Sequence, residues 1–379
     1  MTSHELHKLI LKHKNGSALL LGNGINLYAH SGCSWNVLLK ALTKVYCPNL
    51  DCSQIPEGIT NTEFFDFLEI SILREIPSYN EDDFERQRIK LDNLSCDYEK
   101  LYKEIQDFAI RSFHTFDIDK YKESLEAFKG FSTDKFMSNS ESILTITELG
   151  NKFGPAVNSR LMQSICNLMN KWVPTEPHRA IVTFAKNNEM PILTTNYDNL
   201  LSQAVNARFY DFKNDRSSEE HPISCCYTTK RKPNVDKFGI WHINGMIKYP
   251  KSILIGLTHY MRALENIRSA ILPSNKYNSE IFQGNQWGFK TLSNTWINLV
   301  FNRNLFIFGL SLESDEVFLR WLLIERAKYY ALFPNLRKQG WYIVAENEKI
   351  PIGKAYFLKS ADINIVSVPN YSSIYNAFK

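Results

Sequence analysis

The chain has 379 residues, of which 44% are hydrophobic and 22% charged, and 44 Lys and Arg against 40 Asp and Glu give it a net charge of +4. This composition is typical of a globular protein and excludes disorder for most of the chain. The weak net charge argues against direct nucleic-acid binding. Its clean apolar runs, such as 18–21 and 305–308, are far shorter than the roughly 18 to 20 residues that span a bilayer, so no membrane helix is predicted.

The seven cysteines are odd in number and scattered, and none forms a Cys-x-x-Cys pair. A disulfide framework and a zinc ribbon are therefore not expected, and no metal site is predicted. The N-terminus lacks the basic and apolar regions of a signal peptide, which predicts a cytoplasmic location. The basic run at 230–232 precedes Pro233 and is interpreted as a solvated loop rather than a phosphate-binding patch.

The first elements predict a strand, a turn and a helix. Residues 5–11 have helical spacing, and the apolar run 17–21 predicts a strand that breaks into a turn at 22–26. The next helix is expected to begin at Ser34, with Trp35 and the leucines of 38–42 on its buried face. This order is the opening of a nucleotide-binding α/β fold.

Residues 48–175 differ from this pattern, because apolar residues recur there at spacings of three, four and seven and strand signals are scarce. We expect a helical insertion domain over 48–175. Residues 1–47 and 176–379 are then one nucleotide-binding domain that is split in the sequence.

The remaining chain alternates helices with strands. A helix is predicted at 176–188 and a short last helix at 371–378, and strands are predicted at 191–195, 238–242, 253–255, 305–308, 341–344 and 363–368. This alternation predicts an α/β fold, with a Rossmann-like, mostly parallel sheet covered by helices on both faces. Ligands of such sheets bind beyond the carboxyl ends of the strands.

Four of the predicted strands end in polar or glycine-containing motifs: Gly22-Asn23-Gly24-Ile25-Asn26, Thr194-Thr195-Asn196-Tyr197-Asp198, His242-Ile243-Asn244-Gly245, and Gly309-Leu310-Ser311 with Asp315. Each motif has a structural alternative. The glycines also suit a tight turn, and Leu27 interrupts the full dinucleotide fingerprint. Asn196 and Asp198 also suit a turn and a helix cap, and His242 also suits a buried core position beside Trp241.

Together, in this order, the motifs resemble those of the sirtuin superfamily, and more closely its zinc-free prokaryotic branch of NAD-cleaving enzymes from antiphage defence systems. The resemblance covers about residues 15–47 and 176–370. It implies that Asn196 orients water or a ribose hydroxyl, that His242 is the general base, and that Asp198 positions the ribose or holds Asn196. The cofactor-binding residues that it implies are Gly22, Asn23, Gly24, Asn26, Ser34, Trp35, Thr195, Asn244, Gly309, Leu310, Ser311 and Asp315.

Asn244 occupies the place before glycine where this family normally has its histidine, and His242 lies two residues earlier. Side chains two residues apart on a strand point the same way, so we expect His242 to reach the same site. The four-cysteine zinc module and the Pro-Asp-Phe-Arg element of the deacylase sirtuins are missing. The resemblance therefore implies hydrolysis of NAD to nicotinamide and ADP-ribose rather than removal of acyl groups.

Two other function classes remain open. Asn244 in place of histidine motivates a catalytically silent NAD- or ADP-ribose-binding scaffold in a defence complex. An oxidoreductase is the weaker alternative, because the dinucleotide fingerprint is incomplete.

An NAD hydrolase of this kind needs a gate, and its resemblance to stand-alone members implies control by assembly. The expected partners are further copies of the chain and a hexameric DNA-translocase ATPase encoded nearby, with a short Argonaute system as the second possibility. The biological role implied is NAD depletion in abortive infection.

Overall fold

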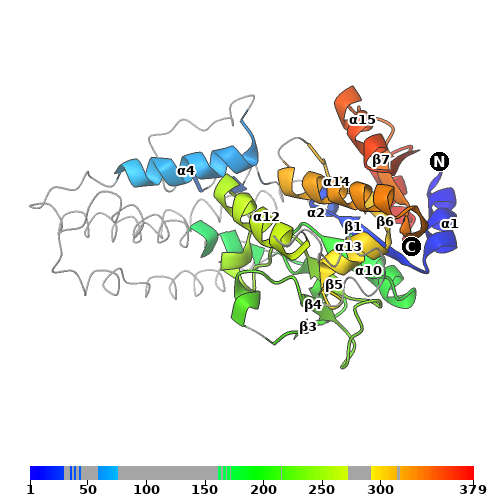
Figure 1. Cartoon of the computed structure of the whole chain (residues 1–379), viewed down its shortest axis with the longest axis horizontal. Coiled ribbons are helices and arrows are strands. Elements are labelled where there is room, and N and C mark those ends of the chain that lie inside the picture. The colour runs from blue at the N-terminus through cyan, green and yellow to red at the C-terminus, as the bar shows by residue number, and fades with distance from the viewer. Residues whose placement is uncertain are drawn as a thin grey trace, which may run out of the picture. The chain divides into compact units, whose positions relative to one another are not determined.

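The computed structural model describes residues 1–29, 59–75, 172–214, 216–271, 292–313 and 316–379, together with residues 35, 38, 39, 42, 43, 161–163, 165–167, 169 and 170 (Figure 1). The chain divides into two compact units. The first consists of Met1–Ala29, Val173–Leu254 and Thr258–Lys379, and the second of His30–Trp172 and Ile255–Leu257. The predicted insertion at 48–175 lies mostly outside the described residues and stays a prediction. Helix α4 (Asn61–Glu75) falls within it.

The first unit is built on an eight-stranded sheet in the order β3-β4-β5-β2-β1-β6-β7-β8. The strands are β1 (Ser17–Leu21), β2 (Ile192–Thr194), β3 (Arg208–Asp211), β4 (Cys225–Thr228), β5 (Ile240–His242), β6 (Asn304–Phe308), β7 (Gly340–Ala345) and β8 (Ile363–Val368). Six strands run parallel, and β3 and β4 add an antiparallel edge.

The chain builds the parallel part of the sheet outward from β1 in two directions. It first adds β2 and then β5 on one side, and later crosses back to add β6, β7 and β8 on the other. The direction of growth therefore reverses between β1 and β6. In open parallel sheets, ligands bind at such a reversal, outside the carboxyl ends of the strands.

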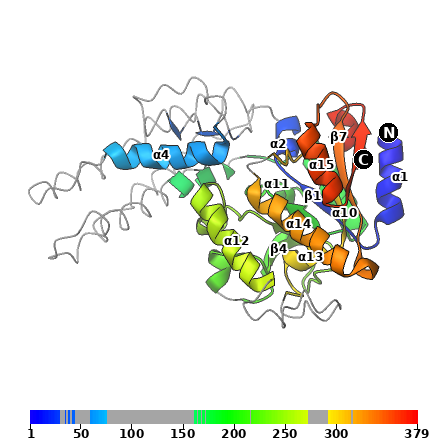
Figure 2. The same cartoon turned by 45° about the horizontal axis from the view of Figure 1, so that its top comes forward.

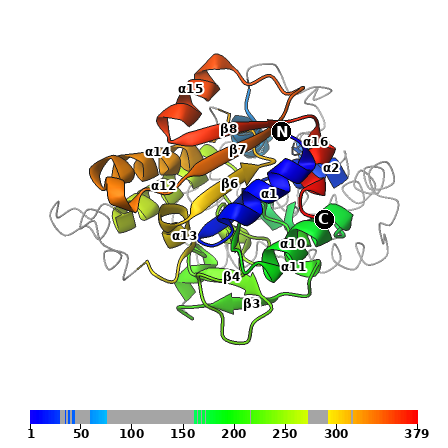
Figure 3. The ribbon, with the colours of Figure 1, turned by 90° about the vertical axis from the view of Figure 1, so that its right-hand side faces the viewer.

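Helices cover both faces of the sheet (Figures 2 and 3). Those of the first unit are α1 (Ser3–His13), α2 (Gly24–Ala29), α10 (Glu176–Asn187), α11 (Leu200–Gln203), α12 (Leu257–Ile271, whose first residue belongs to the second unit), α13 (Trp296–Asn302), α14 (Val317–Leu332), α15 (Ile352–Ser360) and α16 (Tyr371–Asn376). Short 3-10 turns lie at η2 (Arg216–Glu219), η3 (Pro250–Ser252) and η5 (Pro334–Leu336). The predicted Rossmann-like, mostly parallel sheet with helices around it is confirmed.

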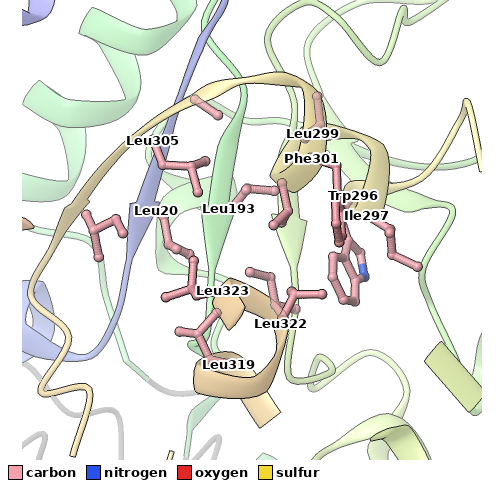
Figure 4. Close-up of a cluster of buried hydrophobic side chains, with 14 of the residues drawn as sticks. Leu20, Leu193, Trp296, Ile297, Leu299, Phe301, Leu305, Leu319, Leu322 and Leu323 are labelled. Carbon is pink, nitrogen blue, oxygen red and sulfur yellow. The ribbon is translucent and has the colours of Figure 1, made fainter. Parts of the chain in front are cut away.

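Alternate strand residues face opposite layers, as the pleat requires. Leu20, Leu193 and Leu305 belong to a core with residues of α13 and α14 (Figure 4). Their neighbours Leu19 and Phe306 belong to a second core with residues of α1, α10 and α16. Because both faces of the central strands β1, β2, β5, β6 and β7 are buried, these strands are mostly apolar, which is why the sequence shows them as short apolar runs.

The N-terminal helix is defined by its capping residues. The Thr2 hydroxyl accepts a hydrogen bond from the Glu5 backbone N–H, while the Glu5 carboxylate accepts from the Thr2 backbone N–H, a reciprocal capping box. Gly16, with φ of +84°, lies between α1 and β1. The N-terminal helix α1 lies beside the C-terminal end of the chain, since a His7 ring nitrogen lies 2.7 Å from the Ala377 carbonyl oxygen (Figure 2).

One predicted strand is wrong and two strands were missed. Residues 253–255 are buried but irregular: they follow the 3-10 turn η3, so their apolar run reflects burial rather than a ladder. Strands β3 and β4 have only four residues each, and β3 alternates between exposed and half-buried positions at the sheet edge. The exposed edge strand β3 carries little apolar signal in the sequence, and β4, although buried between β3 and β5, is only four residues long and ends in Thr228.

Candidate functional site

The carboxyl ends of β1, β2, β5 and β6 lie side by side at one edge of the sheet. Leu21 of β1 pairs with Thr194 of β2 on one side and with Phe308 of β6 on the other, and Thr194 pairs with His242 of β5. The four motifs of the sequence begin at or directly after these residues. The structure therefore brings them together at a single edge, which includes the reversal point between β1 and β6.

Two loops cross closely at the reversal point. The Gly24 backbone N–H donates to the Gly309 carbonyl at 2.8 Å, and a Cβ atom at Gly24 would lie 2.5 Å from the Gly309 Cα. A Cβ at Gly22 would lie 2.8 Å from the Gly309 carbonyl oxygen, and Gly309 has φ of +64°. Glycine is thus required here by contact between the loops. Helix α2 begins directly at Gly24, whereas the sequence predicted a turn through residue 26.

The loop after β6 is held by a hydrogen bond from a side chain of β7. The Tyr342 hydroxyl donates to the Leu310 carbonyl at 2.7 Å, and the Leu310 side chain is buried. Ser311, by contrast, is exposed. A polar side chain on a fixed backbone therefore lies next to the loop crossing.

His242, the last residue of β5, is buried and held in one tautomer. Its Nδ1 lies 2.7 Å from the Asn196 carbonyl oxygen, and because a carbonyl only accepts, Nδ1 carries the ring proton. Burial lowers the pKa of His242 to about 4, although the bond to Asn196 opposes that shift. The ring is therefore neutral near pH 7. Nε2 then bears a lone pair, and among the described residues it has no hydrogen-bond partner.

Two further buried polar atoms near the ends of β2 and β5 have no hydrogen-bond partner in the described part of the chain. They are the Asn196 side-chain nitrogen and the Asn244 side-chain oxygen, on residues that are 6% and 4% exposed. Buried polar groups in folded proteins are nearly always paired. A donor, an acceptor and an imidazole lone pair at neighbouring strand ends suit a polar ligand.

Asn244 does not lie on the strand, so the expectation that positions 242 and 244 share a pleat is wrong. Strand β5 ends at His242, and Asn244 lies in a turn whose main-chain carbonyl accepts from the Leu254 N–H at 2.9 Å. Gly245 has φ of +93°, and a Cβ there would lie 2.1 Å from the Ser252 carbonyl oxygen. The main chain, rather than the pleat, fixes the position of Asn244.

Asp198 is buried and accepts two hydrogen bonds. One carboxylate oxygen accepts from the Leu200 N–H at 3.0 Å, which caps α11, and the other accepts from the Asn26 side-chain nitrogen at 2.8 Å. Burial raises the pKa of Asp198, and these two bonds oppose the shift. Asp198 is thus both a cap, as the structural alternative predicted, and a link between the β1 and β2 loops.

The Asn26 side chain is engaged by the protein on every side. Besides Asp198, its nitrogen donates to the Asn23 side-chain oxygen at 2.8 Å, and its oxygen lies 2.9 Å from His178 Nε2. His178 is not among the residues predicted for the site. The available signal was its place in the first turn of α10, three residues after Thr175, but helix-start positions of that kind are common.

The remaining predicted residues fall into three groups. The Thr195 N–H donates to the Leu21 carbonyl at 3.1 Å and so ties β2 to β1. Trp35 is helical and half-buried but belongs to the second unit. Ser34 and Asp315 lie outside the described residues.

No group of three or more His, Cys, Asp or Glu side chains suited to a metal ion is present in the described ranges. Nor does any helix in that part of the chain combine the length and apolarity needed to cross a membrane.

Comparison with known proteins gives one family. Residues 191–366, which run from the start of β2 into β8, match the model of the SIR2-like domain. No curated protein matches the chain. The match supports the sirtuin-like superfamily, and a SIR2-like domain implies NAD binding and an NAD-related activity in general.

Proposed function

We propose, on the premise that residues 191–366 form a SIR2-like domain, that the protein is an NAD hydrolase that releases nicotinamide and ADP-ribose. One observation carries the proposal: the His242 imidazole lone pair and the Asn196 amide donor are both buried without a partner among the described residues. They lie at neighbouring strand ends on the ligand-binding edge of a parallel sheet.

The reaction breaks the bond between the ribose C1 carbon and the nicotinamide nitrogen, and the electron pair leaves with nicotinamide. Water forms the new bond to C1 and loses one proton, so NAD and water give nicotinamide, ADP-ribose and a proton. The ribose carbon passes through an oxocarbenium-like state, as in glycoside cleavage. Since the leaving group departs from a cationic nitrogen, the reaction requires no general acid.

His242 Nε2 is the proposed acceptor of the proton from water. A base whose pKa is about 4 is too weak to deprotonate free water to a useful extent. Water becomes strongly acidic, however, once it bonds to a cationic carbon. A weak, neutral base is therefore sufficient. The Asn196 amide N–H donates to the water or to a ribose hydroxyl and orients it.

We assign the pyrophosphate and adjoining ribose to Gly22, Gly24 and Asn26, and the adenosine half to Gly309 and Ser311. The resemblance of the motifs and the position of the two loops at the reversal point between β1 and β6 support this assignment. Because the glycines are already required by the crossing, glycine substitutions would not isolate a contact with NAD.

The direct test measures nicotinamide release from NAD by the purified protein, alone and with its native partner. We expect Asn196→Ala and His242→Ala each to lower kcat by about 10²- to 10⁴-fold, the usual range for loss of a proton-transfer or orienting group. The exposed residues His4 and Asn364 supply matched control variants, His4→Ala and Asn364→Ala, which are expected to keep full activity.

One outcome would reject the residue assignment and another the function. Undiminished turnover in both Asn196→Ala and His242→Ala would remove these residues from the mechanism. Tight binding of NAD with no nicotinamide release under any condition would instead favour the scaffold function.

We further propose that this activity depletes NAD in abortive infection, and that assembly with further copies and a hexameric DNA-translocase ATPase gates it. The resemblance to stand-alone defence enzymes supports this, and the scattered cysteines disfavour the zinc-containing deacylase alternative. The mass of the native particle, with and without the ATPase, tests the assembly. Cellular NAD should fall after phage infection with the native protein and not with His242→Ala.

A further inference from the structure

A chain of hydrogen bonds runs from the start of α10 to Asp198. The Thr175 backbone N–H lies 3.2 Å from His178 Nδ1 and the Thr175 hydroxyl 2.8 Å from it. His178 Nε2 lies 2.9 Å from the Asn26 side-chain oxygen, and the Asn26 nitrogen donates to Asp198 at 2.8 Å. His178 and Asn26 are each 1% exposed and Asp198 is 3% exposed, so the chain is shielded from solvent.

The direction of every bond follows from the Thr175 backbone. A backbone N–H only donates, so His178 Nδ1 must accept and the neutral ring carries its proton on Nε2. Nε2–H then donates to the Asn26 oxygen, which turns the Asn26 NH₂ group toward Asp198 and Asn23. A flipped amide would place its oxygen against the Asp198 carboxylate and its NH₂ against Nε2–H, and both contacts are repulsive.

We propose that His178 is a positioning residue, which fixes the Asn26 amide through Nε2–H and thereby holds the Asp198 carboxylate at the edge of the site. This proposal rests on the proposed function, because the site that it serves is the one assigned to NAD cleavage. Asp198 is two residues from Asn196, whose carbonyl holds His242, so a shift of Asp198 reaches both proposed catalytic groups.

A matched pair of substitutions tests the two ring nitrogens of His178 separately. His178→Gln places an amide N–H near the position of Nε2 and keeps the donor to Asn26 but loses the acceptor for Thr175. His178→Asn places its oxygen near Nδ1 and keeps that acceptor but loses the donor. Thr175→Ala is the control, because it removes a hydroxyl and leaves the backbone N–H that sets the direction.

The first measurement uses no substrate. With ¹⁵N-labelled histidine, we expect His178 protonated on Nε2 and His242 protonated on Nδ1, each assigned by loss of its signal in a variant. The side-chain amide signals of Asn26 should move in His178→Asn and stay close to those of the native protein in His178→Gln. Observation of His178 protonated on Nδ1 would overturn the inference, whether or not NAD is cleaved.

The second measurement uses NAD. We expect His178→Asn to lower kcat by about 10- to 100-fold with a smaller change in KM, as is usual when a supporting hydrogen bond is lost, while His178→Gln and Thr175→Ala stay within about threefold of the native protein. Equal kcat values for the Asn and Gln variants, with an active native protein, would overturn the positioning role. Absence of cleavage by the native protein would reject the proposed function, and the amide signals would still decide the positioning chain.

Discussion

Two buried histidines near the same edge of the sheet are held in opposite tautomers. His242 donates from Nδ1 to a carbonyl, whereas His178 accepts at Nδ1 from a backbone N–H. In each case the main-chain group next to Nδ1 sets the tautomer, because a carbonyl can only accept a hydrogen bond and an N–H can only donate one. Nε2 then has the opposite role from Nδ1. His242 therefore keeps a lone pair on Nε2, and His178 presents a donor to Asn26.

Burial of His242 makes the stability of the fold depend on pH. Its pKa is about 4 in the folded protein against an ordinary value of 6.5, so between these values the unfolded chain binds a proton that the folded chain does not. Stability is therefore fully present above pH 6.5 and falls as the pH decreases toward 4. The expected loss between pH 7.5 and pH 5 is about 2 kcal/mol from this residue.

The measurement is urea unfolding at pH 7.5 and pH 5 in the native protein and in His242→Asn, whose amide still donates toward the Asn196 carbonyl. Burial also lowers the pKa of His259 to about 4, but that contribution is common to both proteins and cancels in the difference. An equal pH dependence in the two proteins would show that His242 is not held neutral by the fold.

At the scale of elements, the loops after β1 and β6 act as a unit because they touch through their backbones. Gly24→Ala would drive a methyl group into the Gly309 backbone, so we expect a loss of about 1 to 3 kcal/mol in the free energy of unfolding, the usual cost of overpacking. Gly353→Ala in α15 meets no atom within 4 Å and should gain about 0.5 kcal/mol by restricting the unfolded chain.

Chemical denaturation of the two alanine variants beside the native protein checks this contrast. If Gly24→Ala were as stable as Gly353→Ala, the close crossing at the reversal point would be wrong.

At the amino ends of β6 and β7, a buried arginine of α14 holds the chain by hydrogen bonds. Arg326 donates to the carbonyls of Val300 and Arg303, where α13 leads into β6, and to those of Lys338 and Gln339, which precede β7. Its side chain is fully buried, and its guanidinium lies over the Tyr330 ring. One guanidinium group thus donates to main-chain carbonyls that precede two strands, β6 and β7.

We expect Arg326→Lys to cost about 3 kcal/mol in the free energy of unfolding, because lysine cannot reach these carbonyls together and leaves some of them buried without a donor. Arg337→Lys, at an exposed arginine that pairs with Asp362, should cost less than about 1 kcal/mol. Both values come from the same denaturation experiment, and similar costs for the two variants would contradict this role of Arg326.

At the scale of the whole molecule, the sheet was predictable because the central parallel strands are buried on both faces and are therefore short apolar runs, whereas the edge strand β8 is partly exposed. Strands β3 and β4 were not predictable, since β3 is an exposed edge strand and β4 is a run of only four residues. The polar motifs at the strand ends could also be predicted, because each of them directly follows a predicted strand.

Long-range hydrogen bonds could not be predicted. The contact between Asn26 and His178 joins residues 152 positions apart, and no local motif sets His178 apart from the other eight histidines. Asn26 was assigned to NAD from its motif, yet its amide is used inside the protein. The sequence thus identifies which loops form the site, and the fold decides which of their side chains remain available.

The most direct test of the central claim is the product balance when the purified protein, with its native partner present, is incubated with NAD. We expect nicotinamide and ADP-ribose to appear in equal amounts, and we expect His242→Ala, correctly folded, to form neither. Recovery of all the NAD intact from the native protein and partner would contradict it.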